Sequence, residues 1–490
     1  MISCTMKDGR VIEPERGLEV DGKYDVIVVG GGMAGVGAGI AAGRMGCRTL
    51  IIERESCLGG LATIGLVNIP MDFLSGIGEE MYKRLEEVDG LWHRNSDPEK
   101  HKLILDRMVT EAGCDILFHT QVVESIVKDG AICGVVVESK SGRRAILAQR
   151  IVDCSGDADA ACFAGCQYSL GRASDHLTQA CSLEFRLGAV DWDAYSASEV
   201  KKSDPQWYSL LEKAIANGDV PAIENHLNWI THVPGRPQHC GKDEVSICIA
   251  HSRNCRPLEN GDLTRMYLEG REQVDILWKF IKKAIPGFQD CYVVDTAPLL
   301  GVRDTRRVLG EYVLTTLDVA GRAKFDDVVA ISWRNYDVHN PDGMGNIKWA
   351  EAELDGKTQY ITCTVRPIPH QDLPPGGKVV DYKGRSPDDP DFCKLPQPEH
   401  YDIPYRCLVP VDVENLLVAG RCLSSDFQAQ SATRLIMCCN SMGEAAGTAI
   451  ALSLRHNVVP RKVDRREIQQ TLIRNGGNLG QKLRDIPGLS

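Results

Sequence analysis

The feature that most constrains the fold of this chain is a short strand followed by a glycine-rich turn near residue 30. The run Tyr24 to Val29, YDVIVV, is apolar and β-branched, which is typical of a buried strand. It leads directly into Gly30, Gly32 and Gly35, which have the spacing G-x-G-x-x-G. The first glycine permits a tight turn, the second lets the backbone approach a ligand, and the third lets the next helix pack closely on the strand. The pattern therefore predicts a strand–turn–helix unit of an α/β fold.

The residues that follow extend this unit in the expected order. A helix of small residues is expected over Ala34 to Met45, and a second apolar strand, Thr49 to Ile52, ends on Glu53. The helix N-terminus offers unpaired N–H groups and the positive end of its dipole to a pyrophosphate. Glu53 lies where an acid accepts hydrogen bonds from ribose hydroxyls. These features predict a dinucleotide site. The alternative, a tight turn without a ligand, is disfavoured by the acid at the strand end.

The residues after Glu53 favour one class of dinucleotide. Arg54 to Thr63, RESCLGGLAT, resembles the extension that follows this acid in two-dinucleotide-binding flavoproteins. Gly65 to Pro70, GLVNIP, resembles part of the GG-x-AT-x-G-x-V-x-x-P stretch of a bacterial FAD-dependent oxidoreductase family. That family has the glutathione-reductase-like FAD fold and is related to fumarate reductases and HdrA-type flavoproteins. The resemblance implies FAD as the cofactor and an α/β fold: a Rossmann-like domain with a β-meander, and an inserted α+β substrate domain.

The resemblance also implies which residues surround the cofactor, in several segments of the chain. The first segment contributes Gly30, Gly32, Met33, Ala34, Gly35, Glu53, Arg54, Gly59, Gly60, Ala62 and Thr63. Val122 falls where such flavoproteins hold adenine with backbone groups, although it can equally be an ordinary strand residue. The strand IVDCSGD, which ends at Asp157, resembles a second flavoprotein fingerprint and contributes Ser155, Gly156 and Asp157. Asp157 can also serve as a helix N-cap.

The C-terminal part resembles the last FAD segment of the family. Asn415 to Arg421, NLLVAGR, reads as a strand, and Ser424 to Leu452 reads as one long helix of small and apolar residues. In the family this helix points its N-terminus at the flavin, where its dipole stabilises a reduced, anionic ring. Simple packing of the helix on the sheet is the alternative. The residues implied here are Gly420, Arg421, Arg434, Met442 and Gly443.

Turn signals and periodicity divide the rest of the chain. Helices are expected over Gly78 to Val88 and Pro98 to Ala112, and a three-stranded meander over Val122 to Val127, Ala131 to Glu138 and Arg144 to Ala148. A long helix is expected over Leu263 to Ile285. We predict an FAD-binding domain in two parts, residues 1–170 and 400–460. Residues 171–399 form the substrate domain between them, and residues 461–490 a C-terminal extension.

The substrate chemistry is the least constrained part of the prediction. Arg306 and Arg307 lie in a stretch, Leu300 to Thr315, that resembles a family segment with paired arginines, and His339 lies in another, YDVHNPD. An arginine can clamp a carboxylate, and a histidine can move a proton near neutral pH. We therefore predict His339, Arg306 and Arg307 as catalytic, with Asp337 beside them. Surface ion pairs and a solvated loop are equally good explanations. Second-line candidates are Tyr401, Tyr405, Arg406, Arg434 and His370.

Other redox and metal chemistries are disfavoured. Only one G-x-G-x-x-G is present, so a nicotinamide cofactor would bind only transiently. Cys57 lacks the second thiol of a disulfide reductase, which favours a buried structural cysteine. The densest set of soft ligands lacks a C-x-x-C pair, so no metal site is predicted. It comprises His239, Cys240, Cys248, His251 and Cys255.

Composition bounds the partners. With 56 Lys and Arg against 67 Asp and Glu, the net charge is −11, which argues against nucleic acid. The polar N-terminus and the lack of a long apolar run predict no signal peptide and no membrane span. Nineteen scattered cysteines suit a reducing cytoplasm. We also expect a homo-oligomer that acts on a small-molecule substrate.

The sequence thus predicts an FAD-dependent oxidoreductase that transfers hydride between flavin N5 and a small organic substrate. Two alternatives stay open. One is an ene-reductase that resembles fumarate reductases and is fed by an electron-transfer partner protein. The other is a non-catalytic flavoprotein subunit that relays electrons.

Overall fold

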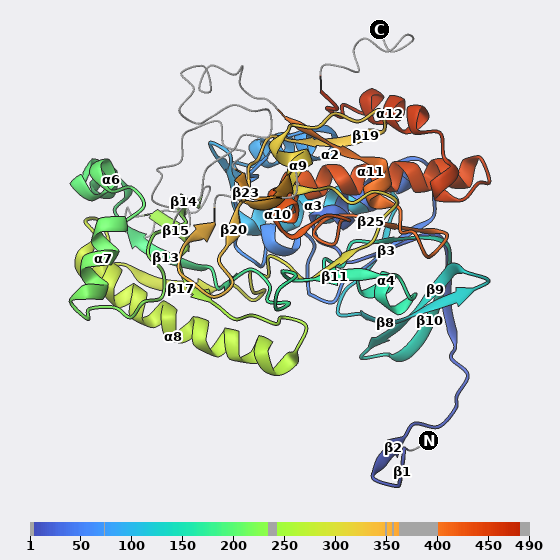
Figure 1. Cartoon of the computed structure of the whole chain (residues 1–490), viewed down its shortest axis with the longest axis horizontal. Coiled ribbons are helices and arrows are strands. Elements are labelled where there is room, and N and C mark those ends of the chain that lie inside the picture. Colours follow the sequence, from blue (N-terminus) through green and yellow to red (C-terminus); the bar gives the residue numbers. More distant parts are fainter. Residues whose placement is uncertain are drawn as a thin grey trace.

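The chain folds into two adjoining bodies, each with its own apolar core. The computed structural model describes residues 4–72, 74–233, 243–347, 350–354, 357–361 and 400–480. Figure 1 shows the larger body around the helix α11 and the smaller one around the long helix α8. Near the N-terminus, the hairpin of β1 (Thr5–Lys7) and β2 (Arg10–Ile12) projects away from both.

The larger body is built on a seven-stranded sheet. Its spatial order is β7–β4–β3–β10–β9–β8, and β25 also pairs with β10. Pairing is parallel from β7 through β10 and between β10 and β25, whereas β8, β9 and β10 form an antiparallel meander. This confirms the predicted Rossmann-like sheet with its meander. The bounds are β3 Val20–Val29, β4 Thr49–Ile52, β7 Asp115–Leu117, β8 Gln121–Lys128, β9 Ala131–Ser139, β10 Gly142–Asp153 and β25 Leu416–Val418.

Both faces of this sheet are covered, which explains the continuous apolar runs in its strands. Along β3, Val26 and Val28 join one core cluster, whereas Ile27 and Val29 join another on the opposite face. On the first face α1 (Met33–Arg44) packs against α11 (Ile436–Arg455), and a Cβ added to Gly443 would lie well under 3.0 Å from the Ala34 carbonyl oxygen. The glycine therefore allows the two backbones to touch.

One predicted strand boundary is wrong. The third meander strand and the strand that begins at Ile151 are a single element, β10, which pairs with β9 in its first half and with β25 at its end. The two predicted strands left out the polar residues Gln149 and Arg150, which lie between them. Arg150 instead donates from Nε to Ser453 Oγ at 3.1 Å and from Nη2 to Val458 O at 2.9 Å, so the strand continues.

The predicted helix Ser424 to Leu452 is also wrong as a single element. It is two helices, α10 (Phe427–Thr433) and α11, bent by 92° at Arg434 and Leu435. No glycine or proline marks the bend. Leu435 is extended there, with φ −74° and ψ 152°, and the Arg434 guanidinium donates to Asp337 O at 2.9 Å. Tertiary contacts rather than local propensity thus place the bend.

The smaller body is an antiparallel sheet of order β14–β15–β13–β17 with helices against it. Its strands are β13 Phe185–Val190, β14 Trp229–His232, β15 Asp243–Cys248 and β17 Tyr292–Thr296, with β12 Cys181–Ser182 and β16 His251–Ser252 beside them. Its helices are α5 Trp192–Ala197, α6 Glu199–Ser203, α7 Tyr208–Ala216 and α8 Asn260–Ala284. The predicted long helix corresponds to α8.

The segment that follows the smaller body in the sequence packs in the core of the larger body. Residues Leu314, Val319, Val328 and Val338 belong to the same cluster as α1 and α11, not to that of α8. Within the predicted substrate domain, residues 171–399, this part therefore packs with the FAD-binding sheet. The proposed domain boundaries stay a prediction.

The remaining elements are short. The predicted helices near residues 80 and 105 are α2 Gly76–Glu87 and α3 Pro98–Glu111; the others are α4 Asp159–Phe163, α9 Thr316–Ala320 and α12 Arg465–Arg474. The two-stranded pairs are β5 Leu91–Trp92 with β6 Asn95–Ser96, β11 Tyr168–Leu170 with β18 Arg306–Val308, β19 Val328–Ser332 with β24 Tyr401–Pro404, β20 Val338–His339 with β21 Asn346–Ile347, and β22 Ala350–Leu354 with β23 Lys357–Ile361. In the described ranges no single helix is long and apolar enough to cross a membrane. Only the bent pair α10 and α11 reaches that length and composition together.

Candidate functional site

A pocket of about 300 Å³ opens at the N-terminus of α1, where the carboxyl ends of the parallel strands β3, β4 and β10 meet. This is the position at which open α/β sheets bind ligands. Predicted cofactor residues from all four segments line it. They are Gly30, Gly32, Met33, Ala34, Glu53, Arg54, Gly59, Gly60, Val122, Ser155, Gly156, Asp157, Gly420, Arg421 and Arg434.

The glycine turn has the geometry that the sequence pattern requires. Gly30 has φ +94°, and a Cβ there would lie 2.6 Å from Cys154 O. A Cβ on Gly35 would lie well under 3.0 Å from Gly30 O. Gly32 differs, because a Cβ there would meet no atom within 4 Å. The first and third glycines are therefore needed for packing, whereas the second leaves open space in the pocket wall.

Glu53 is held at the end of β4 by two backbone donors. Gly31 N–H donates to its Oε2 at 2.6 Å, and Glu55 N–H donates to its Oε1 at 2.8 Å. The side chain is buried, and this burial raises the pKa of Glu53 although both hydrogen bonds oppose the shift. Each carboxylate oxygen keeps a further acceptor site. The residue can thus receive hydroxyl donors from a ligand in the pocket.

Asp157 joins the second and last predicted segments. Its Oδ1 accepts from Arg421 Nη2 and from Thr305 Oγ1, both at 2.8 Å, and its Oδ2 lies 3.7 Å from Arg54 Nη1. Burial opposes ionisation of Asp157, but the two arginines outweigh it and lower its pKa. This arrangement leaves a charged, hydrogen-bonded wall at one side of the pocket.

Asp153 is a supporting residue that the sequence analysis did not single out. It is fully buried, and its Oδ1 accepts from the backbone N–H of Ser155 at 3.0 Å and from Ser155 Oγ at 2.7 Å. Its Oδ2 accepts from Ala161 N–H at 2.8 Å. In the sequence, Asp153 is one acid within the run IVDCSGD, and nothing local marks it as the residue that binds the following turn.

Some predicted cofactor residues do not line the pocket. They are Gly35, Ala62, Thr63, Met442 and Gly443. Thr63 donates from Oγ1 to Leu58 O at 2.7 Å and so shapes the turn that carries Gly59 and Gly60. Met442 is fully buried in the core between helices. These residues support the pocket wall from behind.

The smaller body supplies a wall that the sequence analysis missed. Its lining residues are Pro257, Leu263, Tyr267, Leu299, Leu300 and Val302. Tyr267 on α8 donates to Pro298 O at 2.8 Å and accepts from Leu300 N–H at 2.9 Å, which fixes this segment over the pocket. Of these residues, Leu263 and Tyr267 lie on the amphipathic helix α8, where the sequence does not distinguish them from core positions.

A second pocket, of about 240 Å³, adjoins the first. Both pockets are lined by Leu61, which lies in the turn Gly60–Ala62, and by Arg434 and Ile436, which lie at the bend between α10 and α11. The second pocket also contains the predicted residues Asp337 and His339. The bend thus contributes to a wall that the first pocket shares with this second cavity.

His339 is buried and neutral in this second pocket. Its Nε2 lies 3.7 Å from Asp337 Oδ1, and its ring stacks on that of His251 with centroids 5.2 Å apart. Burial and then the charge of Arg303 lower the pKa of His339 to about 3, although Asp337 opposes the shift. Its Nδ1 has no hydrogen-bond partner among the described residues. The imidazole is therefore neutral near pH 7, and its low pKa makes it a weak base in this environment.

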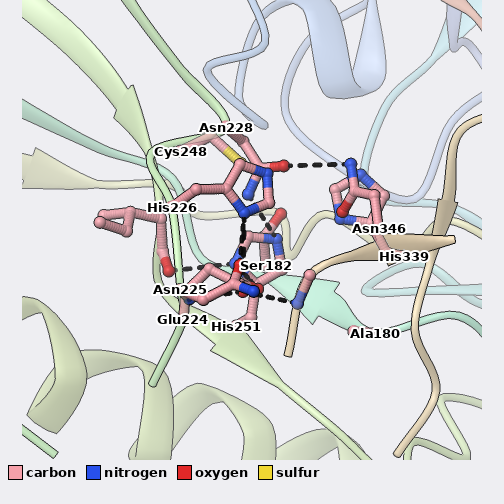
Figure 2. A network of polar contacts seen from close by, with 12 residues as sticks. Ala180, Ser182, Glu224, Asn225, His226, Asn228, Cys248, His251, His339 and Asn346 are labelled. Atoms are coloured by element: carbon pink, nitrogen blue, oxygen red, sulfur yellow. Dashed lines mark hydrogen bonds and ion pairs between the residues drawn. The ribbon is translucent and has the colours of Figure 1, made fainter. Parts of the chain in front are cut away.

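A polar network lies behind His339. In Figure 2 Asn346 and His339 lie side by side, and His251 lies close to Glu224. His251 Nδ1 is 3.0 Å from Ile249 O, which assigns its proton to Nδ1 and leaves Nε2 as an acceptor. Burial, followed by the charge of Arg303, lowers the pKa of His251 well below its usual value. Both histidines are thus uncharged near neutral pH.

Arg306 and Arg307 lie elsewhere. Arg307 is buried and donates from Nη1 to Asp304 Oδ1 at 2.6 Å and from Nη2 to Gly171 O at 2.8 Å. Arg306 Nη1 donates to Asp157 O at 2.9 Å and to Asp159 Oδ1 at 3.0 Å. Neither lines either pocket. We therefore do not include Arg306 and Arg307 in the proposed mechanism.

The second-line candidates also make structural contacts. Tyr401 donates to Ala432 O at 3.1 Å, Tyr405 donates to Pro460 O at 2.9 Å, and Arg406 pairs with Asp327. His239, Cys240 and His370 lie outside the described residues. Within the described ranges, no group of three or more His, Cys, Asp or Glu side chains is placed to hold a metal ion.

The first pocket fits a dinucleotide. Its glycine turn presents open backbone where a pyrophosphate would lie, the first N–H groups of α1 face it, and Glu53 is held ready for hydroxyl donors. The N-terminal residues Ile436 and Cys439 of α11 line the other end of the pocket. A flavin there would meet the positive end of the α11 dipole.

Known proteins resemble parts of the chain. A tRNA uridine 5-carboxymethylaminomethyl modification enzyme, MnmG, from Geotalea uraniireducens is 32% identical over 149 residues, which are 25% of this chain and 23% of that protein. A thiamine thiazole synthase from Methanococcus aeolicus is 32% identical over 154 residues, 29% of this chain and 58% of that protein. The chain therefore matches only a quarter to just over half of the length of these relatives.

A solved structure and a family model match more of the chain. A geranylgeranyl bacteriochlorophyll reductase-like protein from Thermoplasma acidophilum covers 94% of this chain and 86% of its own, at 13% identity and a TM-score of 0.42. The family model described as FAD dependent oxidoreductase matches residues 25–472. The chain thus belongs to the FAD dependent oxidoreductase family and uses FAD as its cofactor.

Proposed function

We propose that this FAD-dependent oxidoreductase transfers hydride between flavin N5 and a small organic substrate held in the second pocket. The observation that carries the proposal is the shared wall of Leu61, Arg434 and Ile436, which puts a polar cavity directly beside the dinucleotide pocket. A substrate there would lie next to the cofactor while its polar groups met His339 and Asp337. The smaller pocket suits a small molecule rather than a second dinucleotide.

FAD, when bound, supplies the two-electron chemistry at N5. The chain's own residues bind and orient it. The N–H groups at the start of α1 would hold the pyrophosphate, Glu53 would accept from the ribose, and Asp157 with Arg421 would close the side of the pocket. The α11 N-terminus would favour negative charge on the ring.

His339 would handle the proton. Its neutral imidazole would accept the proton that an alcohol or amine substrate releases as its hydride leaves, provided that the bound substrate raises its pKa from about 3. Asp337 Oδ1, 3.7 Å from His339 Nε2, would then stabilise the imidazolium. The neutral resting state favours the oxidation of a substrate over the protonation of an alkene.

An anaerobic experiment tests this proposal. The protein is reconstituted with FAD and mixed with a panel of small alcohols and amines, and bleaching of the oxidised flavin is followed. His339→Asn is expected to retain FAD but to slow bleaching by about 10²- to 10⁴-fold, the usual contribution of a general base. Equal rates in wild type and His339→Asn would remove His339 from the mechanism. If no substrate bleaches the flavin, but unsaturated acids reoxidise the photoreduced protein, the ene-reductase alternative is favoured.

We also propose a cellular compartment for this protein. Every cysteine that the structure describes is a free thiol, including the buried Cys57, Cys181 and Cys422. That state suits a reducing compartment, and we place the protein in the cytoplasm. The homo-oligomer and the electron-transfer partner protein remain predictions.

A further inference from the structure

The second pocket contains a buried cation without an acidic partner. Arg303 is 93% buried, with a relative exposure of 7%. Its Nη1 donates to Ala180 O at 2.7 Å, and its Nη2 lies 3.3 Å from His251 Nε2 and 3.7 Å from Cys248 Sγ. All three acceptors are neutral. Within the described ranges, no Asp or Glu oxygen lies within 4.0 Å of the Arg303 guanidinium.

Such a cation is expensive to bury. A guanidinium removed from water loses several kcal/mol of hydration, and proteins normally recover this with a paired carboxylate. Arg307 follows this rule. Its guanidinium lies 2.6 Å from the carboxylate of Asp304, which offsets the lost hydration. Arg303 has no such carboxylate among the described residues, and its side chain lines the second pocket. The missing negative charge is therefore expected from a ligand.

The charges that line the pocket support the same conclusion. Three arginines line it, Arg303, Arg334 and Arg434, against two carboxylates, Asp337 and Glu184. With His339 neutral, these arginines and carboxylates leave one excess positive charge in the lining. Asp337 is already engaged, because it lies 3.3 Å from Arg434 Nη2 and accepts from Asn346 Nδ2 at 3.1 Å.

Glu184 does not supply the missing charge. Its Oε1 accepts from Ser182 Oγ at 2.7 Å, and it makes no ion pair with Arg303. Arg334 likewise has no carboxylate within ion-pair distance among the described residues, and its guanidinium lies 5.1 Å over the Trp333 ring. Once Asp337 is paired with Arg434, Arg303 and Arg334 face only Glu184, which leaves one positive charge in excess.

We propose that the substrate of this enzyme carries a carboxylate, and that the carboxylate pairs with Arg303 in the second pocket. A planar guanidinium with free N–H groups matches a carboxylate better than any neutral group. Arg334 lines the same cavity and adds positive charge there. Arg434, at the wall shared with the FAD pocket, orients the rest of the molecule toward the flavin. This inference rests on the proposed function, because it takes the second pocket as the substrate site.

A carboxylate would also prepare His339 for its role. The charge of Arg303 is, after burial, the main reason that the pKa of His339 is low. An anion beside Arg303 offsets that repulsion and raises the proton affinity of the imidazole. Substrate binding would therefore create the base that the reaction needs.

Matched ligand pairs test the inference on the FAD-loaded protein. Lactate is compared with lactamide, and propionate with propionamide, by perturbation of the flavin absorption spectrum and by the thermal midpoint. The carboxylate of each pair is expected to bind about 10- to 150-fold more tightly, the value of one hydrogen-bonded charge at 1.5–3 kcal/mol. Arg303→Gln should abolish this preference without loss of FAD, and Arg303→Lys should restore part of it.

Two further variants keep the test decisive. Arg265→Gln on α8 is the matched control, since this arginine forms ion pairs with Asp262 and Glu269, donates to Arg253 O and lines neither pocket. The ligand preference of this variant should equal that of the wild type. Arg334→Gln, on a less buried side chain, should weaken the preference if Arg303→Gln does not fold. Equal binding of acids and amides by the wild type overturns the inference, as does an unchanged preference in a folded Arg303→Gln.

The outcomes also separate this inference from the proposed function. If only neutral alcohols bleach the flavin, and bleaching still depends on His339, the inference of a carboxylate substrate is wrong. Hydride transfer would then still be supported. Arg303-dependent carboxylate binding with no flavin redox change for any ligand would support the anion site and overturn hydride transfer.

Discussion

Replacement of Gly32 by alanine separates the cofactor function of the glycine turn from its structural function. A Cβ at Gly32 meets no protein atom within 4 Å, and its φ of −64° suits any residue. It would project into the space where the pyrophosphate must approach the backbone. Gly35→Ala is the structural counterpart, because a Cβ there would run into the Gly30 carbonyl oxygen at well under 3.0 Å.

The size of the Gly32 effect follows from what the methyl displaces. If the phosphate loses one backbone hydrogen bond to a charged oxygen, about 1.5–3 kcal/mol is lost, which weakens FAD binding about 10- to 150-fold. The apoprotein should hardly change: alanine is a poorer N-cap than glycine by a few tenths of a kcal/mol or more, but it stiffens the unfolded chain by about 0.4–1 kcal/mol. The two terms nearly cancel.

The assay is a titration of flavin-free protein with FAD, followed by the quenching of flavin fluorescence, together with thermal unfolding of the same apoprotein. Gly32→Ala should unfold at the wild-type temperature and bind FAD far more weakly. Gly35→Ala should unfold at a clearly lower temperature before any cofactor is added. Wild-type FAD affinity in Gly32→Ala would refute the placement of the pyrophosphate at this turn.

Four other predictions concern stability and the arginines. Burial raises the pKa of Glu444 to about 7, so between pH 4.5 and 7 the unfolded chain ionises first and stability falls as pH rises; Glu444→Gln should remove on the order of 3 kcal/mol of this fall, as measured by urea unfolding across pH. Gly443→Ala should force α1 and α11 apart at Ala34 and cost about 1–3 kcal/mol, seen as a lower melting temperature, whereas an unchanged melting temperature would contradict the close helix contact. Arg307→Gln should destabilise the fold by about 3–5 kcal/mol because it strands a buried carboxylate. Arg306→Gln should keep both FAD and wild-type flavin reduction; a folded Arg306→Gln protein that had lost reduction would restore its predicted catalytic role.

The nucleotide half of the fold could be predicted because its signals are local. The turn at Gly30 needs a residue with positive φ, the strands that flank it are buried on both faces, and Glu53 follows its strand directly. Each of these constraints acts within a few residues. The sequence therefore placed β3, α1 and β4 within a few residues of their observed bounds.

The substrate side could not be predicted in the same way, because its residues meet only through tertiary contacts. Arg303 and Arg307 are alike in the sequence, four residues apart in the same stretch. Only the fold shows that Arg307 meets Asp304 whereas Arg303 faces a cavity. The pocket residues on α8 were not predicted for a similar reason. In the sequence, Tyr267 resembles any apolar position of an amphipathic helix.

The bend between α10 and α11 joins the two sides of the site. A continuous helix from Ser424 onward would carry Arg434 on a surface set by helical periodicity alone. The 92° bend instead starts a second helix, whose first turn faces the flavin pocket, and leaves Arg434 at the junction with its guanidinium bound to Asp337 O. One irregular junction thus places both the N-terminus of α11 at the first pocket and a cation at the second. Since burial lowers the pKa of Arg434 only to about 10, that cation stays charged at neutral pH, and any reaction in the second pocket takes place beside it.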